Sequence, residues 1–362
     1  MSHPLYRRRF GGLLGVGALG ALGAGHAARW AHAAAAELPL FDAHIHYSHD
    51  AWALVPPPQA ITILRQSGLR GALVSSSNDL GTQMLVAEAN AAGLPGLIVP
   101  SLRPYRSRGE IGSWMKDDSV PRYLDERLAR YRYAAVGEFH LYGEDADLPV
   151  PRRMVALARQ HGLLLHAHSD VAAIDRLLRQ WPEARVLWAH SGFEPPEQVR
   201  TQLRRHPRLW CDLAFRGDHA TGSQVDPAWR EAFDEFPGRF MIGTDTFTPE
   251  RWHYIGSHAS WSRGWLATLP APLAEAIGWR NAESLLRGAA PREPGRCCAA
   301  LRPRAMRQGA RQSRGRCAGP AGAAGRARPD WLGPGCARRP HRLRHTPGRP
   351  GPAGGKGHRR RV

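Results

Sequence analysis

Histidines recur in this sequence directly after short apolar segments. The first such segment ends in His44 and His46, and two later segments end in His166 and His168 and in His190. In a β-strand, residues i and i+2 face the same side, so we expect the two histidines of each pair to project from one face. Imidazole nitrogens held in this way are common ligands of a divalent metal ion. Each pair alone is equally compatible with two polar residues at the end of a strand.

Carboxylates occupy similar positions along the chain. Glu138 lies near the end of another apolar segment, two residues before His140, and Asp245 follows the last such segment. Nitrogen and carboxylate ligands suit Zn²⁺, Mn²⁺, Fe²⁺ or Ni²⁺. Cys211 is the only cysteine between residues 37 and 288, which argues against a structural zinc site built from cysteines. A carboxylate at such a position could also pair with an arginine or cap the next helix.

The segments that must position these side chains are short and apolar. Most are rich in Val, Ile, Leu or aromatic residues, which is typical of strands buried on both faces. Eight predicted strands follow from this pattern, at residues 38–46, 69–76, 96–102, 134–141, 162–168, 185–190, 209–215 and 239–244.

Helices are predicted between the strands, among them 120–130, 154–161, 170–181 and 196–206, with Asp170 as an N-cap. Alternating strands and helices predict a parallel sheet. Eight strands over roughly 250 residues fit a closed (β/α)8 TIM barrel, an α/β fold, which we assign to residues 37–288; a doubly wound open sheet is the alternative. In such a barrel the active site lies at the C-terminal ends of the strands, where the histidines and carboxylates would meet.

The net charge of +19 invites a nucleic-acid interpretation, but it is unevenly distributed. Residues 289–362 contribute +17 and the first 36 residues +4, so the predicted barrel carries −2. A nearly neutral barrel speaks against a polyanionic substrate, and we expect no specific nucleic acid binding by the barrel.

The N-terminus predicts export. Arg7, Arg8, Arg9 and Phe10 precede a weakly apolar, Gly- and Ala-rich run, and small residues near position 35 suit a signal-peptide cleavage site. We interpret residues 1–36 as a twin-arginine-type signal peptide, which predicts a periplasmic or secreted protein. An uncleaved anchor or a basic leader is the alternative. The run is shorter and milder than a membrane anchor of about 20 apolar residues, so no stable membrane anchor is expected.

The C-terminal segment 289–362 has a different composition. It is rich in Arg, Gly and Pro and contains very few large apolar residues, so it predicts a disordered basic tail. A shifted reading frame in a GC-rich gene would produce such a tail. The functional alternative, from a different class, is a basic arm through which the protein binds nucleic acid.

Several motifs together resemble a known family. FDAHIH, VGEFHLYG, LLLHAHSD, VLWAHSG and FMIGTDTF occur in the order and spacing of the amidohydrolase superfamily, and are most similar to its amidohydrolase-2 group of barrel hydrolases and decarboxylases. NAESLLRG, at 281–288, resembles the closing helix of that family. The resemblance covers about residues 38–288.

The resemblance implies roles for individual residues. His44, His46, His166 and Asp245 match metal ligands, with His168 as a second candidate on the same strand. His190 matches a residue that binds a second metal or polarises the substrate, and Asp245 matches the acceptor of the proton of the attacking water. Many members bridge two metal ions with a carboxylated lysine on the strand where this chain has Glu138. A glutamate can take a similar role, so Glu138 is a candidate metal ligand, and the resemblance implies one or two divalent ions, which we expect to be zinc.

The predicted function is hydrolysis of a small molecule, in which metal-activated water attacks an amide, ester or lactone carbon. Arg103, Arg216 and Arg251 follow predicted strands and are candidates, with His140 and His168, for binding the substrate. The alternatives on the same barrel are a metal-dependent non-oxidative decarboxylase and a metal-dependent deoxyribonuclease. The sequence is compatible with an oligomer and does not name the substrate.

Overall fold

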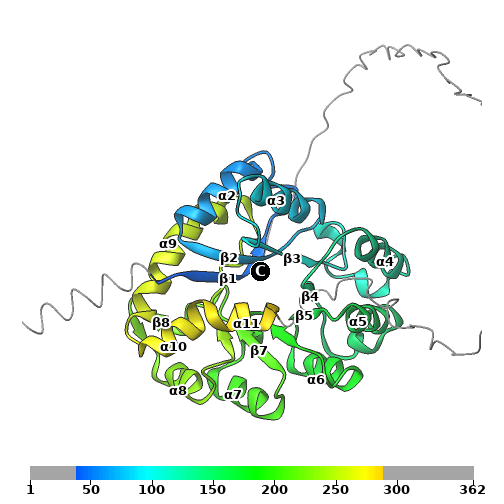
Figure 1. Cartoon of the computed structure of the whole chain (residues 1–362). Helices are drawn as coiled ribbons and strands as arrows, with labels where there is room; N and C mark the ends of the chain where they lie inside the picture. The colour runs from blue at the N-terminus through cyan, green and yellow to red at the C-terminus, as the bar shows by residue number, and fades with distance from the viewer. Residues whose placement is uncertain (1–37, 288–362) are drawn as a thin grey trace, which may run out of the picture. The chain divides into compact units, whose positions relative to one another are not determined.

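The computed structural model describes residues 38–287, which form a ring of parallel strands surrounded by helices (Figure 1). Each strand of the ring pairs with the next one along it. The strands are β1 (Leu40–His46), β2 (Leu69–Ser75), β3 (Ile98–Leu102), β4 (Ala135–His140), β5 (Leu164–His168), β6 (Val186–Trp188), β7 (Leu209–Asp212) and β10 (Phe240–Met241).

The first and last strands of the sheet also meet. The Ala43 N–H donates to the carbonyl oxygen of Ile242 over 3.0 Å, and the Asp245 N–H donates to that of His44 over 2.7 Å. These bonds close the ring. The predicted TIM barrel is therefore confirmed, and the doubly wound open sheet is wrong.

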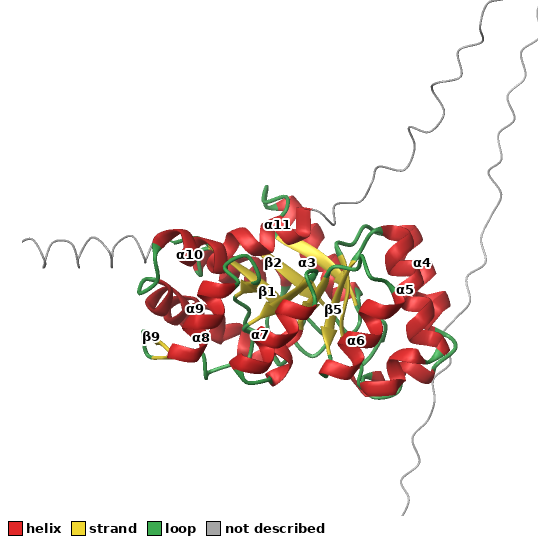
Figure 2. Ribbon diagram, turned by 90° about the horizontal axis from the view of Figure 1, so that it is seen from below, coloured by secondary structure: helices red, strands yellow, loops and turns green. Residues whose placement is uncertain are grey.

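Helices cover the outside of the barrel (Figure 2). The predicted helix at 120–130 has the same bounds in the structure, and the Asp170 carboxylate accepts a hydrogen bond from the Ala173 N–H, as expected of an N-cap. The helices are α2 (Pro57–Gln66), α3 (Leu80–Ala91), α4 (Val120–Arg130), α5 (Pro149–His161), α6 (Val171–Gln180), α7 (Pro196–Arg205), α8 (Pro227–Glu235), α9 (Pro249–Leu266), α10 (Ala271–Glu275) and α11 (Asn281–Arg287).

The barrel interior is packed at its N-terminal end. Side chains that point inward from the strands, such as Phe41, Leu164 and Met241, form a cluster with Leu285 and Leu286 of α11. This helix lies across that end of the barrel (Figure 1). The interior is therefore a solid core, and polar side chains meet only at the opposite, C-terminal end of the strands.

Some elements of the loops were not predicted. A two-stranded hairpin, β8 (Ala220–Thr221) with β9 (Gln224–Val225), lies between β7 and α8. The strands β6 and β10 are also shorter than predicted, because the chain enters turns that carry His190 and Asp245.

The predicted signal peptide at 1–36 and the predicted tail at 289–362 lie outside the described residues, so both stay predictions. Among the described helices, not one combines the length and apolar character that a membrane span requires.

Candidate active site

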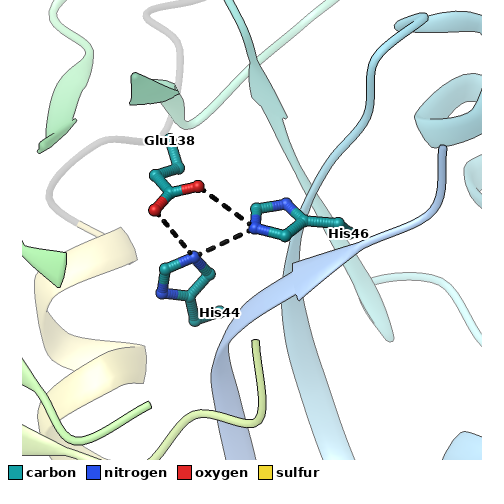
Figure 3. A group of neighbouring side chains, drawn as sticks. All are labelled: His44, His46 and Glu138. Atoms are coloured by element: carbon teal, nitrogen blue, oxygen red, sulfur yellow. Dashed lines mark hydrogen bonds and ion pairs between the residues drawn. The ribbon is translucent and has the colours of Figure 1, made fainter. Parts of the chain in front are cut away.

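Four side chains that can bind a metal ion meet at the C-terminal end of the barrel. The Nε2 atoms of His44 and His46 are 3.1 Å apart. Glu138 places Oε1 3.4 Å from His44 Nε2 and Oε2 3.2 Å from His46 Nε2, and all three side chains point toward one another (Figure 3). Asp245 Oδ1 lies 3.1 Å from His46 Nε2 and 3.7 Å from His44 Nε2. All four residues are buried, and we call them the four-ligand group.

The spacing of the four-ligand group fits a divalent ion. In a tetrahedral zinc site with bonds of about 2.0–2.1 Å, neighbouring ligand atoms are about 3.3–3.4 Å apart. The five distances of 3.1–3.7 Å, measured to both oxygens of Glu138, lie near this value, and His44, His46 and Glu138 offer ligand atoms within 4.8 Å of one another. The chemistry of the donors, two imidazole nitrogens and two carboxylates, is also that of a zinc ligand set.

Hydrogen bonds behind the two histidines favour the tautomer that binds a metal. His46 Nδ1 lies 3.0 Å from the Ser75 hydroxyl oxygen, and His44 Nδ1 lies 3.2 Å from Asp212 Oδ2. A carboxylate only accepts hydrogen bonds, so His44 Nδ1 carries a proton toward Asp212. Burial opposes a second proton, but the Glu138 and Asp212 carboxylates outweigh burial and hold the pKa of His44 well above its usual value, so His44 is positively charged without an ion. An ion that binds between the two Nε2 atoms, 3.1 Å apart, would replace the proton on His44 Nε2.

The backbone that carries these ligands is tied together by Asp42. Its carboxylate accepts hydrogen bonds from the N–H groups of His44 and Thr244, both at 3.0 Å, and from the Thr244 hydroxyl at 2.7 Å. Burial raises the pKa of Asp42 to about 6 despite these hydrogen bonds. These hydrogen bonds of Asp42 hold β1 against the segment that carries Asp245. Asp245 itself adopts a left-handed conformation with φ 50°.

Gly137 is required next to Glu138. It has a φ of +126°, and a Cβ added there would lie 2.1 Å from the carbonyl oxygen of His166. We expect Gly137→Ala to lower the free energy of unfolding by about 1–3 kcal/mol, because both backbone strain and overlap oppose the side chain. Chemical denaturation measures the loss, and Gly93→Ala, where a Cβ meets open space at a positive φ of +71°, is the control for a left-handed glycine without overlap. Equal losses for the two variants would contradict the overlap.

Arg103 binds Glu138 from behind. Its Nη2 donates to Glu138 Oε2 over 2.6 Å, its Nε to the Glu138 carbonyl oxygen over 3.2 Å, and its Nη1 to the Ser77 hydroxyl over 3.1 Å. Nη2 also lies 3.1 Å from His46 Nε2. Arg103 was predicted to bind the substrate, and the structure places it in the pocket wall, where it orients the carboxylate of Glu138.

Several histidines stabilise the ionised form of Glu138. Burial opposes its ionisation, but the positive charge of His44 and hydrogen bonds from the neighbouring histidines outweigh burial and hold the pKa of Glu138 well below its usual range. His168 Nδ1 lies 2.9 Å from Oε1, and His140 Nε2 lies 3.7 Å from Oε2. The rings of His140 and His168 stack at 4.0 Å, so the structure brings both predicted substrate-binding histidines to one side of the site.

The structure does not bring His166 into the four-ligand group. Its Nε2 lies 3.1 Å from Asp212 Oδ2, deeper in the barrel, while the side chain two residues later, His168, contacts Glu138. Burial and the charge of His44 lower the pKa of His166 to about 4, so it is neutral at pH 7. A role for His166 as a metal ligand stays a prediction.

Asp212, at the end of β7, was missed by the sequence analysis. Its Oδ1 accepts hydrogen bonds from the N–H groups of His190 at 2.8 Å and Ala214 at 3.1 Å, and its Oδ2 lies within 3.2 Å of ring nitrogens of both His44 and His166. Burial favours the neutral acid, but the charge of His44 and these bonds hold the pKa of Asp212 far below its usual range. An acidic residue inside the predicted apolar strand 209–215 was the available signal.

His190 lies in a left-handed turn directly after β6, with φ 56°. Its Nδ1 is 2.8 Å from the carbonyl oxygen of Ala214, which can only accept a hydrogen bond, so Nδ1 carries a proton. Its Nε2 is 3.5 Å from Glu138 Oε1 and faces the pocket. Burial opposes protonation of His190, but the hydrogen bond with Glu138 outweighs burial and raises its pKa.

The two remaining arginine candidates support loops. Arg216 pairs with Asp218 at 2.5 Å and donates to the His190 carbonyl oxygen at 3.0 Å. Arg251 donates to the carbonyl oxygens of Asp245 and Thr244. Both line a neighbouring pocket of about 300 Å³ rather than the pocket that contains the four-ligand group.

The sequence of the chain identifies its family. A sequence model of the amidohydrolase family matches residues 101–288, which is more than half of the chain. The chain belongs to the amidohydrolase family. The protein is therefore a hydrolase, as the motifs predicted, and its family is generally metal-dependent. No curated protein matches the sequence significantly.

Solved structures with similar folds include three bacterial proteins. One is described as a putative 2-pyrone-4,6-dicarboxylic acid hydrolase from Pseudomonas putida (18% identity, 69% of this chain and 98% of that chain, TM-score 0.46). Another is a mutant organophosphorus hydrolase from Deinococcus radiodurans (15% identity, 70% of this chain and 94% of that chain, TM-score 0.45). The third is an uncharacterised TIM-barrel protein from Bordetella bronchiseptica (15% identity, 70% of this chain and 99% of that chain, TM-score 0.43).

Proposed function

We propose that this protein is an exported, zinc-dependent hydrolase that cleaves an ester or lactone of a small molecule. The observation that carries the proposal is the four-ligand group, His44, His46, Glu138 and Asp245, whose atoms have the spacing of a zinc ligand set. Three of its members, His46, Glu138 and Asp245, line a pocket of about 330 Å³, which is large enough for a small substrate. The signal peptide predicted at residues 1–36 supports a periplasmic or secreted location.

The chain supplies a base next to the ion site. A divalent ion, when bound, lowers the pKa of water to about 7 and polarises a carbonyl group. Asp245 Oδ1 lies 3.1 Å from His46 Nε2, beside the proposed ion site. Burial favours the neutral form of Asp245, but the hydrogen bond with His46 and the charge of His44 outweigh burial and lower its pKa to about 2. Asp245 is therefore ionised at pH 7, accepts the proton of the attacking water and returns it to the leaving group.

His190 supplies a donor on the other side of the pocket. Because Nδ1 donates to the Ala214 carbonyl, only the imidazolium form carries a second proton, on Nε2. In that form Nε2–H donates to the oxygen of the substrate on which negative charge develops. Asp212 fixes this turn through the His190 N–H, so the direction of Nε2 depends on a residue outside the pocket.

We expect one ion per chain rather than two. The Arg103 guanidinium is a permanent positive charge that donates to Glu138 Oε2 over 2.6 Å, so this oxygen is already paired and is not free to bridge to a second ion. Elemental analysis of the purified protein should find about one divalent ion, and activity should fall in proportion as a chelator removes it and return with added zinc.

His46→Asn should lose the ion, whereas His161→Asn, at the end of α5, is a control that keeps it. Full hydrolytic activity in chelator, with well below one ion per chain, would show that the reaction does not need the metal. Two ions per chain would contradict the role given to Arg103.

A further inference from the structure

Three phenylalanines line the pocket above the four-ligand group. Phe193, Phe215 and Phe247 are 51%, 50% and 37% exposed, and every other phenylalanine within residues 38–287 is buried or half-buried. Exposed large apolar side chains gathered at one place indicate a binding surface. We propose that this pocket binds an uncharged planar ring, so that the substrate is a neutral aryl ester or aryl-fused lactone; the substrate assignment rests on the proposed hydrolase function.

The backbone holds two of these rings in an unusual conformation. Phe193 has φ 56° and Phe215 has φ 55°, in the left-handed region that residues with a side chain rarely adopt. The other described non-glycine residues with positive φ are His190, Ser191 and Asp245, which lie at the same site. Strained conformations persist where the surrounding structure enforces them, typically at ligand-binding positions. The phenylalanine rings are therefore placed over the pocket by the fold.

The rings form a slot next to the reacting groups. Phe193 stacks on the His190 ring, with centroids 4.6 Å apart and planes 16° apart. Phe215 stands at 70° to His190 and at 74° to Phe247, whose centroid is 5.6 Å away. Arg251 covers both Phe215 and Phe247 at about 5 Å and fixes their positions. Phe193 and Phe215 both lie against His190, and a planar ring bound beside them can make the stacked or edge-to-face contacts that aromatic pairs favour.

The charges in the pocket favour an uncharged ligand. Its two lining arginines each face a carboxylate: Arg103 pairs with Glu138, and Arg108 pairs with Asp50 at 2.5 Å. The lining also contains Asp245 together with His140, His168 and His190, so no guanidinium among the described residues that line the pocket is free to pair with a carboxylate on the substrate. An uncharged ring can bind without competing for these ion pairs.

The reaction balances as a simple hydrolysis. The oxygen of water forms a bond to the carbonyl carbon, and the bond between that carbon and the ring-bearing oxygen breaks. The water proton passes through Asp245 to the leaving oxygen, which gives a carboxylic acid and a phenol. The ring lies against Phe193 and Phe215, and the carbonyl lies toward the four-ligand group.

Selectivity between two lactones tests the slot. Dihydrocoumarin carries a fused aromatic ring and δ-valerolactone does not. For each variant we take the ratio of kcat/KM for dihydrocoumarin to kcat/KM for δ-valerolactone. Dividing this ratio by the wild-type ratio gives a quotient in which the intrinsic reactivities of the two lactones cancel. We expect this quotient to fall by about 5- to 30-fold in Phe193→Ala and in Phe215→Ala. Phe193→Leu keeps apolar volume without a planar ring and should show a similar fall. Leu80→Ala removes an exposed apolar side chain outside the pocket and should leave the quotient unchanged.

Equilibrium binding of unreactive probes separates the slot from the proposed function. In an NMR titration of the metal-loaded protein, acetophenone should bind about tenfold more tightly than cyclohexyl methyl ketone, which is not planar, and than benzoate, which is charged. If no ester or lactone is hydrolysed but Phe193→Ala still weakens acetophenone, the hydrolase assignment fails and the slot stands. An unchanged lactone quotient in both alanine variants, with equal binding of the two ketones, overturns the slot. Tighter binding of benzoate overturns the preference for an uncharged ring.

Discussion

Replacement of Asp245 by asparagine is expected to lower kcat by about 10²- to 10⁴-fold, the range that a positioned general base contributes. An amide cannot accept the proton that the carboxylate takes from water. Asparagine tolerates the left-handed conformation of this residue, with φ 50°, and keeps the backbone hydrogen bond to the His44 carbonyl, so the fold should persist. The assay measures hydrolysis at saturating zinc, because Asp245 Oδ1 is also one of the four ligand atoms.

The matched control is Asp226→Asn. Asp226 also follows a strand and also bonds to backbone, because it caps α8 through the N–H groups of Ala228 and Trp229. Its replacement should change stability slightly and leave kcat intact. If Asp245→Asn keeps wild-type kcat with the ion in place, another group accepts the proton. If the variant loses activity only in proportion to its loss of zinc, Asp245 acts as a ligand and not as a base.

The barrel could be predicted from the sequence because its strands are buried on both faces. Such strands appear as short continuous apolar runs, and the helices between them carry their own stop signals, such as Gly162 after α5, which adopts φ +67°. Strand ends near the site were predicted less well. The chain leaves β6 after Trp188 and then places His190 and Ser191 in left-handed conformations, which apolar periodicity does not indicate.

The sequence predicted that the residues of the four-ligand group lie close together, because this depends only on the topology of the barrel. His44 and His46 lie at the end of β1, Glu138 lies near the end of β4 and Asp245 follows β10, and parallel strands in a barrel bring their C-terminal ends together. Which ring nitrogen faces which oxygen depends on packing between distant strands. From the sequence alone, His166 therefore looked like a metal ligand in the same way as His44 and His46, although in the structure its Nε2 faces Asp212.

Arg103 and the phenylalanine slot show the same limit. The guanidinium of Arg103 reaches back to Glu138, 35 residues away in the sequence, and an arginine after a strand gives no sign of whether it faces the substrate or a carboxylate. Phe193 and Phe215 follow different strands, and only the closed barrel brings both to His190. Contacts of this kind follow from the tertiary structure rather than from any local pattern.

The second large effect is expected at Asp212, which does not belong to the four-ligand group. Its Oδ2 faces Nδ1 of His44 and Nε2 of His166, and its Oδ1 accepts two backbone N–H groups. Asp212→Asn keeps the shape but replaces one acceptor with an NH₂ group and removes the negative charge. If the amide oxygen stays on the backbone N–H groups, the NH₂ group faces His44 Nδ1 and favours the tautomer with the proton on Nε2, where the ion should bind.

We therefore expect Asp212→Asn to weaken zinc binding by about 10- to 100-fold, as is typical when the partner of a ligating histidine is changed. Buried donors without partners should also lower the free energy of unfolding by about 1–3 kcal/mol. Competition with a chromogenic chelator measures the first effect and chemical denaturation of the zinc-free protein the second. Asp175→Asn removes a similar Asp–His contact, 2.7 Å to His206 on the outside of the barrel, and should leave zinc affinity unchanged. Wild-type affinity in Asp212→Asn would mean that the tautomer of His44 is set by the ion alone, and a loss of stability without a loss of affinity would make Asp212 a purely structural residue.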